Sequence, residues 1–276
     1  MQLTDAIQQV KEGLGLKYDF TIVMMGFALL LARLLPTFVL TPMVGGDTTP
    51  TEVKLGLGVI IGMVCFPVIE PSLRQIPTGP VTFMAILLKE IFIGFTISFI
   101  VSIVFDAAQV AGQLVDNMSG TNQAQIMVPS IQTSVSLYAS LKLQLFITLF
   151  LTLNGHHIVI DALASSFRSI PLEAFPRFSN GFWPFFDVVI RVFADMMRIS
   201  LALAAPVLLA TFLTDLALGM INRVAPQVQV FFVAMQIKPA VTVLIVFTSM
   251  HLIMTRVTRE YGVMFEWMRR ALQLMG

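Results

Sequence analysis

The side chains best suited to chemistry are concentrated in one late stretch, DLALGMINRVAPQVQVFF, from Asp215 to Phe232. It holds a carboxylate, a guanidinium and several amides, which pair with charges or hydrogen-bond, but no nucleophile beside a general base. The stretch is either a loop between two apolar helices or a polar site set inside them. On a helix, Asp215, Gly219, Asn222 and Arg223 recur at steps that place them along one face. Pro226 should end that helix, because the residue before a proline resists helical backbone.

Single charges also occur deep inside apolar runs. Lys238 precedes Pro239 well inside one such run, where a lysine costs roughly 3 kcal/mol or more. It should therefore face a protein neighbour or a wet cavity, unless it snorkels to the surface. Lys89 and Glu90 are neighbours about 100° apart on a helix, so they do not both face one partner squarely. One of them is expected to pair with Arg33 or Lys238; the alternative places both near a helix end or in a subunit interface.

His156, His157 and Asp161 raise a metal-site hypothesis, because His157 and Asp161 share a helix face. Adjacent histidines do not both ligate comfortably from one helix, and no third strong ligand is nearby. An interfacial polar turn is therefore the favoured interpretation. GxSxG, Walker A and HExxH motifs do not occur, and only Glu90, with Asp195 second, is a candidate for a membrane-buried carboxylate relay. We predict no enzyme, no cofactor and no metal.

The composition indicates an integral membrane protein. Of 276 residues, 57% are hydrophobic and 12% are charged, whereas soluble domains carry about 25% charged residues. The net charge of +1 argues against a nucleic-acid-binding surface, which needs clustered lysine and arginine. The one cysteine, Cys65, lies in an apolar run and is expected to be buried.

Six apolar segments are long and poor in charge, which predicts an all-α, polytopic membrane protein. Lipid tolerates only helices or closed barrels, and these runs are too long and continuous for barrel strands. The segments are Phe20–Val44, Leu55–Ile69, Val81–Phe105, a fourth from about Leu141 to the Asn154–His157 turn, Val188–Met220 and Val230–Met254. A break at Pro171–Pro184 divides residues 1–170 from residues 171–276, a C-terminal hairpin with an amphipathic tail.

Two further segments carry information about function. The Asp106–Ser140 connection contains no lysine or arginine, and long loops in compact proteins tend to be functional or disordered. Its centre, NMSGTNQAQIMVPS, fits either a seal across a pore or an ordinary outer loop. The tail has apolar residues at helical period from Val257 to Leu272, which predicts an amphipathic helix on a membrane or a partner. Its arginines favour a cytoplasmic C-terminus.

The motifs taken together resemble the FliR/SctT family, the export-gate subunits of flagellar and virulence type III secretion systems. The signature is DLALGMINRVAPQVQVFFVAMQIKP. The block LKEIFIGFTISFIVSIVFDAAQVAGQLVDNMSG is similar to the family's central block, with its Glu-x-x-x-Gly and Ala-Gly-x-Leu patterns. FLTLNGHHIVIDAL, ARLLPTFVLTPMVGG and PTEVKLGLGVIIGMVCFP also match, so the resemblance covers roughly residues 20 to 255 in order.

The resemblance implies roles for particular residues. The family's polar turn, with Pro226 opening the next helix, falls on Asp215, Gly219, Asn222, Arg223, Ala225, Pro226 and Gln227. Its pore-plugging loop falls on about Gly120–Ser134, with Met118, Gly120, Gln125, Ile126, Met127, Val128 and Pro129 as the expected plug residues. The loop lacks the aromatic residue that some flagellar members place there. Lys238 beside Pro239 resembles virulence-type members, which favours the injectisome branch over the flagellar one.

The resemblance also implies an assembly. Members look like a fusion of two smaller export-gate subunits, and their long kinked helical hairpins join several copies of each in a helical, conical complex. The implied partners are FliP/SctR-like, FliQ/SctS-like, FlhB/SctU-like and FlhA/SctV-like membrane subunits, unfolded secreted proteins in transit, and lipid, with no nucleic acid. Charge pairs at subunit contacts are then expected at Arg33, Lys89, Glu90 and Lys238, and the Asp215 face should point at partners or the export channel.

The implied function is a core, non-enzymatic subunit that forms and seals the channel through which unfolded proteins cross the bacterial inner membrane. The runner-up is a secondary transporter for a small solute, with Lys238 and Glu90 in a site near the middle of the membrane. A third hypothesis is an intramembrane metalloenzyme that uses His156 and His157.

Overall fold

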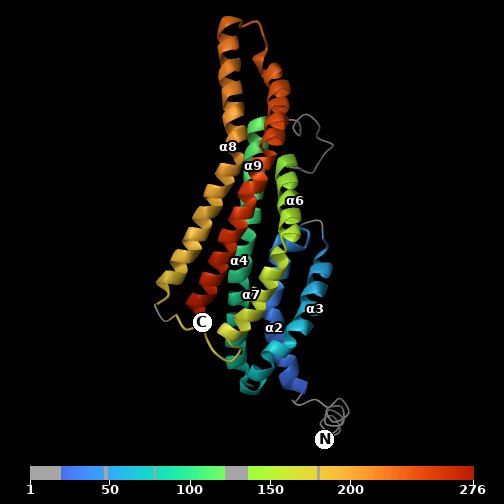
Figure 1. The fold of residues 1–276 in the computed structure, drawn as a ribbon, viewed down its shortest axis with the longest axis vertical. Helices are drawn as coiled ribbons and strands as arrows, with labels where there is room; N and C mark the ends of the chain where they lie inside the picture. Colours follow the sequence, from blue (N-terminus) through green and yellow to red (C-terminus); the bar gives the residue numbers. More distant parts are fainter. Residues whose placement is uncertain (1–19, 47–48, 78, 122–135, 179–180) are drawn as a thin grey trace. The chain divides into compact units, whose positions relative to one another are not determined.

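The computed structural model describes residues 20–46, 49–77, 79–121, 136–178 and 181–276, and within these ranges it contains helices and no strand. The elements in chain order are α2 (Phe20–Leu40), η1 (Pro42–Val44), α3 (Thr51–Ile69), η3 (Glu70–Gln75), α4 (Pro80–Ser119), α6 (Leu137–Thr152), α7 (Gly155–Ser169), α8 (Trp183–Val224) and α9 (Val230–Met275) (Figure 1). The predicted all-α fold is confirmed.

Among the described residues, five helices are long and apolar enough to cross a membrane: α2, α3, α4, α8 and α9. The number rises to six if α6 and α7 together form one span. Because about 20 apolar residues suffice to cross a bilayer, α4, α8 and α9, with 40, 42 and 46 residues, extend well beyond a single span. The chain is a polytopic helical membrane protein.

One sequence-based boundary was wrong, because α4 continues further than its apolar composition suggests. The predicted Asp106–Ser140 connection is shorter, since α4 continues to Ser119 and α6 begins at Leu137. Small and apolar residues hold this extension of α4 inside the chain: Ala107, Ala108, Ala111 and Val115 are buried. The predicted amphipathic tail is the unbroken end of α9, and its apolar positions are buried within the chain instead of covering a membrane or a partner: Val257, Tyr261, Met264, Met268 and Leu272.

Proximity between Cα atoms divides the chain into two compact units. Among the described residues, the first unit comprises those within Met1–Ser102, His156–Val188 and Phe265–Gly276, and the second comprises those within Ile103–Gly155 and Val189–Met264. The first unit has an aliphatic core formed by Leu29, Leu30 and Leu34 of α2 with Ile86 and Ile93 of α4. The predicted division between residues 170 and 171 remains a prediction.

The core of the second unit is aromatic. Tyr261 of α9 is buried, and its hydroxyl donates a hydrogen bond to the carbonyl oxygen of Phe146 in α6 at 2.7 Å. Its ring centroid lies 6.0 Å from that of Phe105 in α4 and 5.5 Å from that of Phe150. Tyrosine suits this position because the ring packs in the apolar core while the hydroxyl finds an acceptor. These contacts tie α4, α6 and α9 together.

The first unit contains a fully buried arginine. Arg33 donates from Nε and Nη2 to the two carboxylate oxygens of Glu90, at 2.5 and 3.0 Å. Its Nη1 donates to the Ser166 hydroxyl at 3.1 Å, Nη2 also donates to the Ile170 carbonyl at 2.9 Å, and its guanidinium lies 4.2 Å from the Phe167 ring centroid. A guanidinium is suited to this two-pronged pairing with a carboxylate. Of the pairings expected for Lys89 or Glu90 with Arg33 or Lys238, the pair of Glu90 with Arg33 is observed, and it joins α2, α4 and the end of α7.

Gly94 explains how α2 and α4 approach closely enough for this pair. A Cβ atom at Gly94 would lie 2.2 Å from the carbonyl oxygen of Arg33, far inside contact distance. Small residues permit such backbone approach between membrane helices. Glu90 and Gly94 are one helical turn apart on α4 and thus share a face. The Glu-x-x-x-Gly pattern therefore contacts one residue twice: the glycine meets the backbone of Arg33 and the glutamate binds its side chain.

Lys89 binds the segment that follows α7. Its Nζ donates to the carbonyl oxygens of Pro171, Leu172 and Ala174 at 3.1, 2.9 and 3.0 Å, and lies 2.6 Å from a carboxylate oxygen of Glu90. The ammonium is thereby surrounded by oxygen acceptors within its own chain. Lys89 and Glu90 thus link α4 to different elements, while the placement of these charges at contacts between subunits stays a prediction.

The buried pair leads to a stability prediction. Glu90→Gln leaves Arg33 without a counter-charge, and we expect a loss of about 3 kcal/mol in the free energy of unfolding, as when a buried pair loses one partner. Chemical denaturation in mild detergent measures this loss. Asp161→Asn, which neutralises an exposed carboxylate on α7, serves as the control and should change stability little. Equal stability of the two variants would show that the pair does not hold the first unit together.

Candidate functional site

Most of the predicted plug residues lie outside the described part of the chain: Gln125, Ile126, Met127, Val128 and Pro129. Met118 and Gly120 are described. Met118 lies in the last turn of α4 with its side chain 49% exposed. Gly120 directly follows α4 with a φ of 76°, the left-handed conformation that commonly ends a helix and favours glycine. The described start of the predicted plug loop is therefore a well-formed helix end.

A buried carboxylate joins the two described ends of this loop. Asp116 in α4 is 1% exposed. Its Oδ1 accepts hydrogen bonds from the Thr121 hydroxyl at 3.1 Å and from the Tyr138 backbone N–H at 3.2 Å, and its Oδ2 accepts one from the Ala139 N–H at 3.1 Å. Thr121 precedes the undescribed residues 122–135, and Tyr138 and Ala139 belong to the first turn of α6. One side chain thus contacts both sides of the connection.

The start of α6 lies directly against the backbone of α4. A Cβ atom at Gly112 would lie 2.2 Å from the Cα atom of Ala139, so only glycine fits there. One turn into α6, the buried Lys142 donates to the carbonyl oxygens of Ala111 in α4 and Leu203 in α8, each at 3.4 Å. Together with Asp116, these contacts form a junction of α4, α6 and α8 in the second unit.

The sequence-based prediction missed Asp116, because the segment around it was predicted to be a loop, and it assigned no role to Lys142. One feature of the sequence nevertheless indicates that α4 continues beyond Phe105. The buried positions Ala108, Ala111 and Val115 continue the helical period of α4 beyond Phe105. With α4 extended, Gly112 and Asp116 fall one turn apart on one face, as Glu90 and Gly94 do earlier in the helix with the glycine and the carboxylate in the opposite order.

The polar stretch forms a hairpin turn between α8 and α9. Helix α8 ends at Val224, and Ala225 accepts a hydrogen bond from the N–H of Val228 at 3.0 Å, which closes a turn across Pro226. The prediction that the helix ends near Pro226 is confirmed. Pro226 does not open the next helix, because α9 begins four residues later at Val230. Proline instead occupies the second position of a four-residue turn, where its fixed φ is favoured.

Asp215 in this stretch pairs with the isolated lysine. The Nζ of Lys238 lies 2.6 Å from Oδ1 of Asp215, across the hairpin from α9 to α8. The pair is not sealed inside the chain, since the side chain of Asp215 is 48% exposed and that of Lys238 is 22% exposed. The other members of the predicted polar set are also exposed: Gly219, Asn222, Arg223, Pro226 and Gln227.

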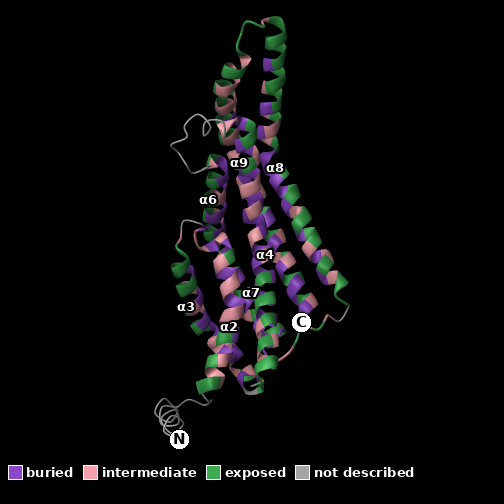
Figure 2. Ribbon diagram, turned by 180° about the vertical axis from the view of Figure 1, so that it is seen from behind, coloured by how far each residue is buried: buried purple, intermediate pink, exposed green. Residues whose placement is uncertain are grey.

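The hairpin exposes large apolar side chains beside this ion pair. Figure 1 shows α8 and α9 running side by side to their connecting turn, and Figure 2 shows long exposed stretches on both. The exposed apolar residues near the turn are Phe212, Leu213, Leu216, Met220, Ile221, Val224, Phe231 and Phe232. Within the chain, this part of the hairpin therefore has an apolar surface that carries a charged pair.

A small cavity is lined both by predicted plug residues and by Lys238 of the predicted charge set. It has a volume of about 100 Å³ and is lined by the end of α4, including Met118 and Gly120, and by the first turns of α9, including Phe231, Met235 and Lys238. The base of the predicted plug loop and the lysine of the hairpin thus share one lining in the second unit. This region, with Asp116, Asp215 and Lys238, is the candidate functional site.

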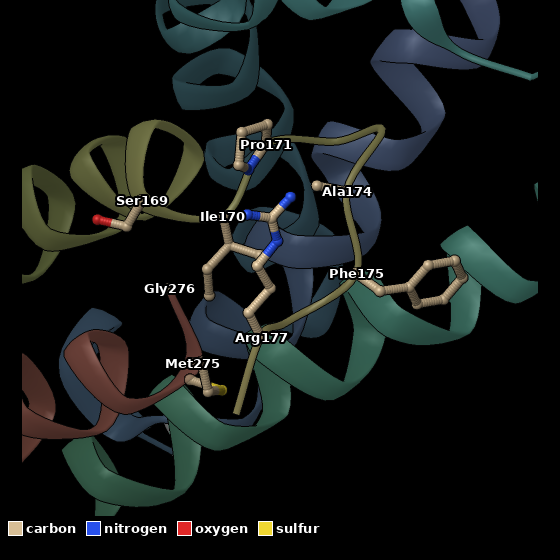
Figure 3. A pocket seen from close by; sticks show the side chains of 8 residues that line it. All are labelled: Ser169, Ile170, Pro171, Ala174, Phe175, Arg177, Met275 and Gly276. Atoms are coloured by element: carbon tan, nitrogen blue, oxygen red, sulfur yellow. The ribbon is translucent and has the colours of Figure 1, made fainter. Parts of the chain in front are cut away.

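A larger cavity in the first unit contains none of the predicted site residues. It has a volume of about 230 Å³ and is lined by residues after α7 and at the end of α9 (Figure 3). Arg177 extends along it toward Pro171 and Ala174, and its backbone N–H donates to the Met275 carbonyl at 3.1 Å. Its lining side chains offer one cation and no carboxylate or imidazole, so they provide no acid–base pair.

The histidine pair does not form part of a larger ligand set among the described residues, where no three His, Cys, Asp or Glu side chains gather to hold a metal ion. The rings of His156 and His157 instead lie against each other, with centroids 4.2 Å apart.

Comparison with known proteins identifies relatives that match most of the chain. The sequence profile of bacterial export proteins, family 1, matches residues 24–264. The flagellar biosynthetic protein FliR of Bacillus subtilis is 29% identical over 252 residues, covering 91% of this chain and 95% of that protein. Yop proteins translocation protein T of Yersinia pestis is 31% identical over 223 residues, covering 79% and 83% of the two chains.

The secretion system apparatus protein SsaT of Salmonella typhimurium is 27% identical over 168 residues, covering 61% of this chain and 64% of SsaT. Flagellar and secretion-system proteins thus both appear among the relatives, and the preference for the injectisome branch remains a prediction. The chain is a structural component with a role in protein export and is not an enzyme. From the profile match and these relatives, we conclude that it belongs to the FliR/SctT family of bacterial export proteins.

Proposed function

We propose that this chain is a core subunit of a type III export gate, which forms and seals the channel through which unfolded proteins cross the bacterial inner membrane. Its membrane partners would be FliP/SctR-like, FliQ/SctS-like, FlhB/SctU-like and FlhA/SctV-like subunits. The C-terminus is assigned to the cytoplasm, because arginines cluster in the last part of α9: Arg256, Arg259, Arg269 and Arg270.

The observation that carries this proposal is the surface of the α8–α9 hairpin. Large apolar side chains surround the half-exposed Asp215–Lys238 pair there. A surface of apolar residues alone would suit lipid, but a carboxylate and an ammonium facing hydrocarbon are costly. A water-facing surface would not carry so many large apolar side chains. A protein partner satisfies both requirements, because it covers the apolar residues and offers polar groups to the pair.

The sealing role is assigned to the loop between α4 and α6. Met118 and Gly120 at its start line the same cavity as Lys238, so the described start of the loop lies beside the hairpin that we propose faces the assembly. Its uncharged, methionine-containing sequence suits an apolar seal that must also open, since methionine adapts to surfaces of different shape.

The transporter hypothesis receives less support. Glu90 is held by Arg33 and Lys89, while Lys238 is paired with Asp215. Each charge proposed for a solute site therefore has a partner of its own.

Deletion of Gly120–Ser134 tests the sealing role. We expect the assembled gate to conduct ions in the absence of substrate while the subunit still enters the complex, because the helices that hold it there are intact. Conductance of the reconstituted complex in planar bilayers measures the leak. Replacing Gln125–Pro129 with glycine and serine at unchanged length separates the effect of the apolar side chains from that of chain length. A resting conductance equal to that of the wild type in both variants would remove the sealing assignment.

Substitution of Lys238 tests the hairpin surface. Lys238→Met leaves Asp215 unpaired at the proposed contact, and we expect recovery of the subunit with its partners to fall roughly tenfold, equivalent to about 1.4 kcal/mol of binding. Quantitative affinity purification of the complex measures this recovery. Arg198→Gln is the matched control, because it breaks a partly exposed pair with Asp195 elsewhere on α8. If lipid covered the hairpin, Lys238→Met would insert more readily and assemble normally, which would refute the proposal.

A further inference from the structure

Helix α6 begins without a cap from its own sequence. The first backbone N–H groups of any helix lack acceptors within that helix, and a serine at the N-cap position ordinarily supplies one. Ser136 occupies that position in α6, but its side chain makes no capping hydrogen bond. The N–H groups of Tyr138 and Ala139 instead donate to the carboxylate of Asp116 in α4. The cap of α6 thus comes from a different helix, and the negative charge also suits the helix N-terminus.

The same carboxylate holds the other side of the connection. The hydroxyl of Thr121 donates to Oδ1 of Asp116 at 3.1 Å and to its backbone carbonyl oxygen at 3.0 Å. Thr121 is the last described residue before the undescribed residues 122–135, and α6 begins at Leu137. Both described ends of the connection therefore meet at one buried side chain.

Neighbouring contacts fix the position of that side chain. Gly112, one turn before Asp116, lets α6 approach so closely that any side chain there would overlap Ala139. Lys142, one turn after Tyr138, ties the same face of α6 to carbonyl oxygens of α4 and α8. Because both contacts lie on the turn of α4 that directly precedes Asp116, the carboxylate is a fixed point to which the connection is attached.

We propose that Asp116 is the positioning residue of the α4–α6 connection: by binding both described ends, it fixes Thr121 and the first turn of α6 relative to each other. This inference rests on the proposed sealing function and names Asp116 as the residue that holds the described ends of the sealing loop in position. An aspartate suits the task because its two oxygens accept all three donors at once. Asparagine keeps a single acceptor oxygen and turns N–H donors toward the N–H groups of α6.

The test must separate positioning from simple stabilisation of α6. Asp116→Ala removes both the cap and the link between the two ends. Asp116→Ala with Ser136→Asp gives α6 a cap of its own, since aspartate is a favoured N-cap residue, but leaves the link broken. Asp161→Ala, at an exposed carboxylate on α7, is the control. The readouts on the assembled complex are hydrogen exchange in peptides containing Tyr138 and Ala139, and resting ion conductance.

We expect Asp116→Ala to accelerate exchange at Tyr138 and Ala139 at least tenfold and to raise resting conductance toward that of the Gly120–Ser134 deletion. In the double variant, exchange protection should return while the leak persists, and Asp161→Ala should match the wild type. Loss of the leak in the double variant would overturn the inference, because it would show that Asp116 only stabilises α6. Should Asp116→Ala fail to assemble, Thr121→Val removes the link from the α4 side alone and should still leak.

The outcomes also separate this inference from the sealing function. If the Gly120–Ser134 deletion raises resting conductance but Asp116→Ala does not, positioning by Asp116 is refuted and the sealing function stands. If the deletion leaves resting conductance unchanged, the sealing function is refuted. If hydrogen exchange at Tyr138 and Ala139 is unchanged in Asp116→Ala, the contact itself is refuted.

Discussion

A charge placed among apolar membrane helices requires partners, and this requirement organises the described part of the chain. An unpaired charge in a low-dielectric interior is so costly that its partners must be fixed in place. Arg33 is fully buried and gains the carboxylate of Glu90, the hydroxyl of Ser166 and a backbone carbonyl oxygen. These partners come from α4 and from α7 with the residue after it, so satisfying one guanidinium determines how three parts of the first unit pack.

Helix α4 contains the same combination of a glycine and a carboxylate at two places. In each case a glycine lets another helix reach the backbone of α4, and a carboxylate one turn away binds that helix. Gly94 and Glu90 hold α2 through Arg33, whereas Gly112 and Asp116 hold the start of α6. The first pair lies in one compact unit and the second in the other. A single long helix thereby supplies an anchoring point to each unit.

The sequence predicted the helices and the end of α8 near Pro226, because each depends on local pattern. The strong cost of a buried charge also predicted that Lys89 or Glu90 pairs with Arg33 or Lys238, without indicating which of these pairs forms. The sequence did not predict that α4 extends to Ser119, because polar residues such as Asp106, Gln109 and Gln113 interrupt the apolar run on which the prediction rested. Asp116 was missed for the same reason. The pairing of Lys238 with Asp215 depends on the register of two helices across a turn, which sequence spacing does not determine.

The central claim is that this chain works as one member of a mixed membrane assembly, with the α8–α9 hairpin covered by other proteins. Native mass spectrometry of the complex purified through this subunit tests that claim most directly. We predict a single large species that contains this chain together with several copies of other membrane polypeptides, and no free homo-oligomer. A stable homo-oligomer that binds a small solute and contains no other polypeptide would contradict the account.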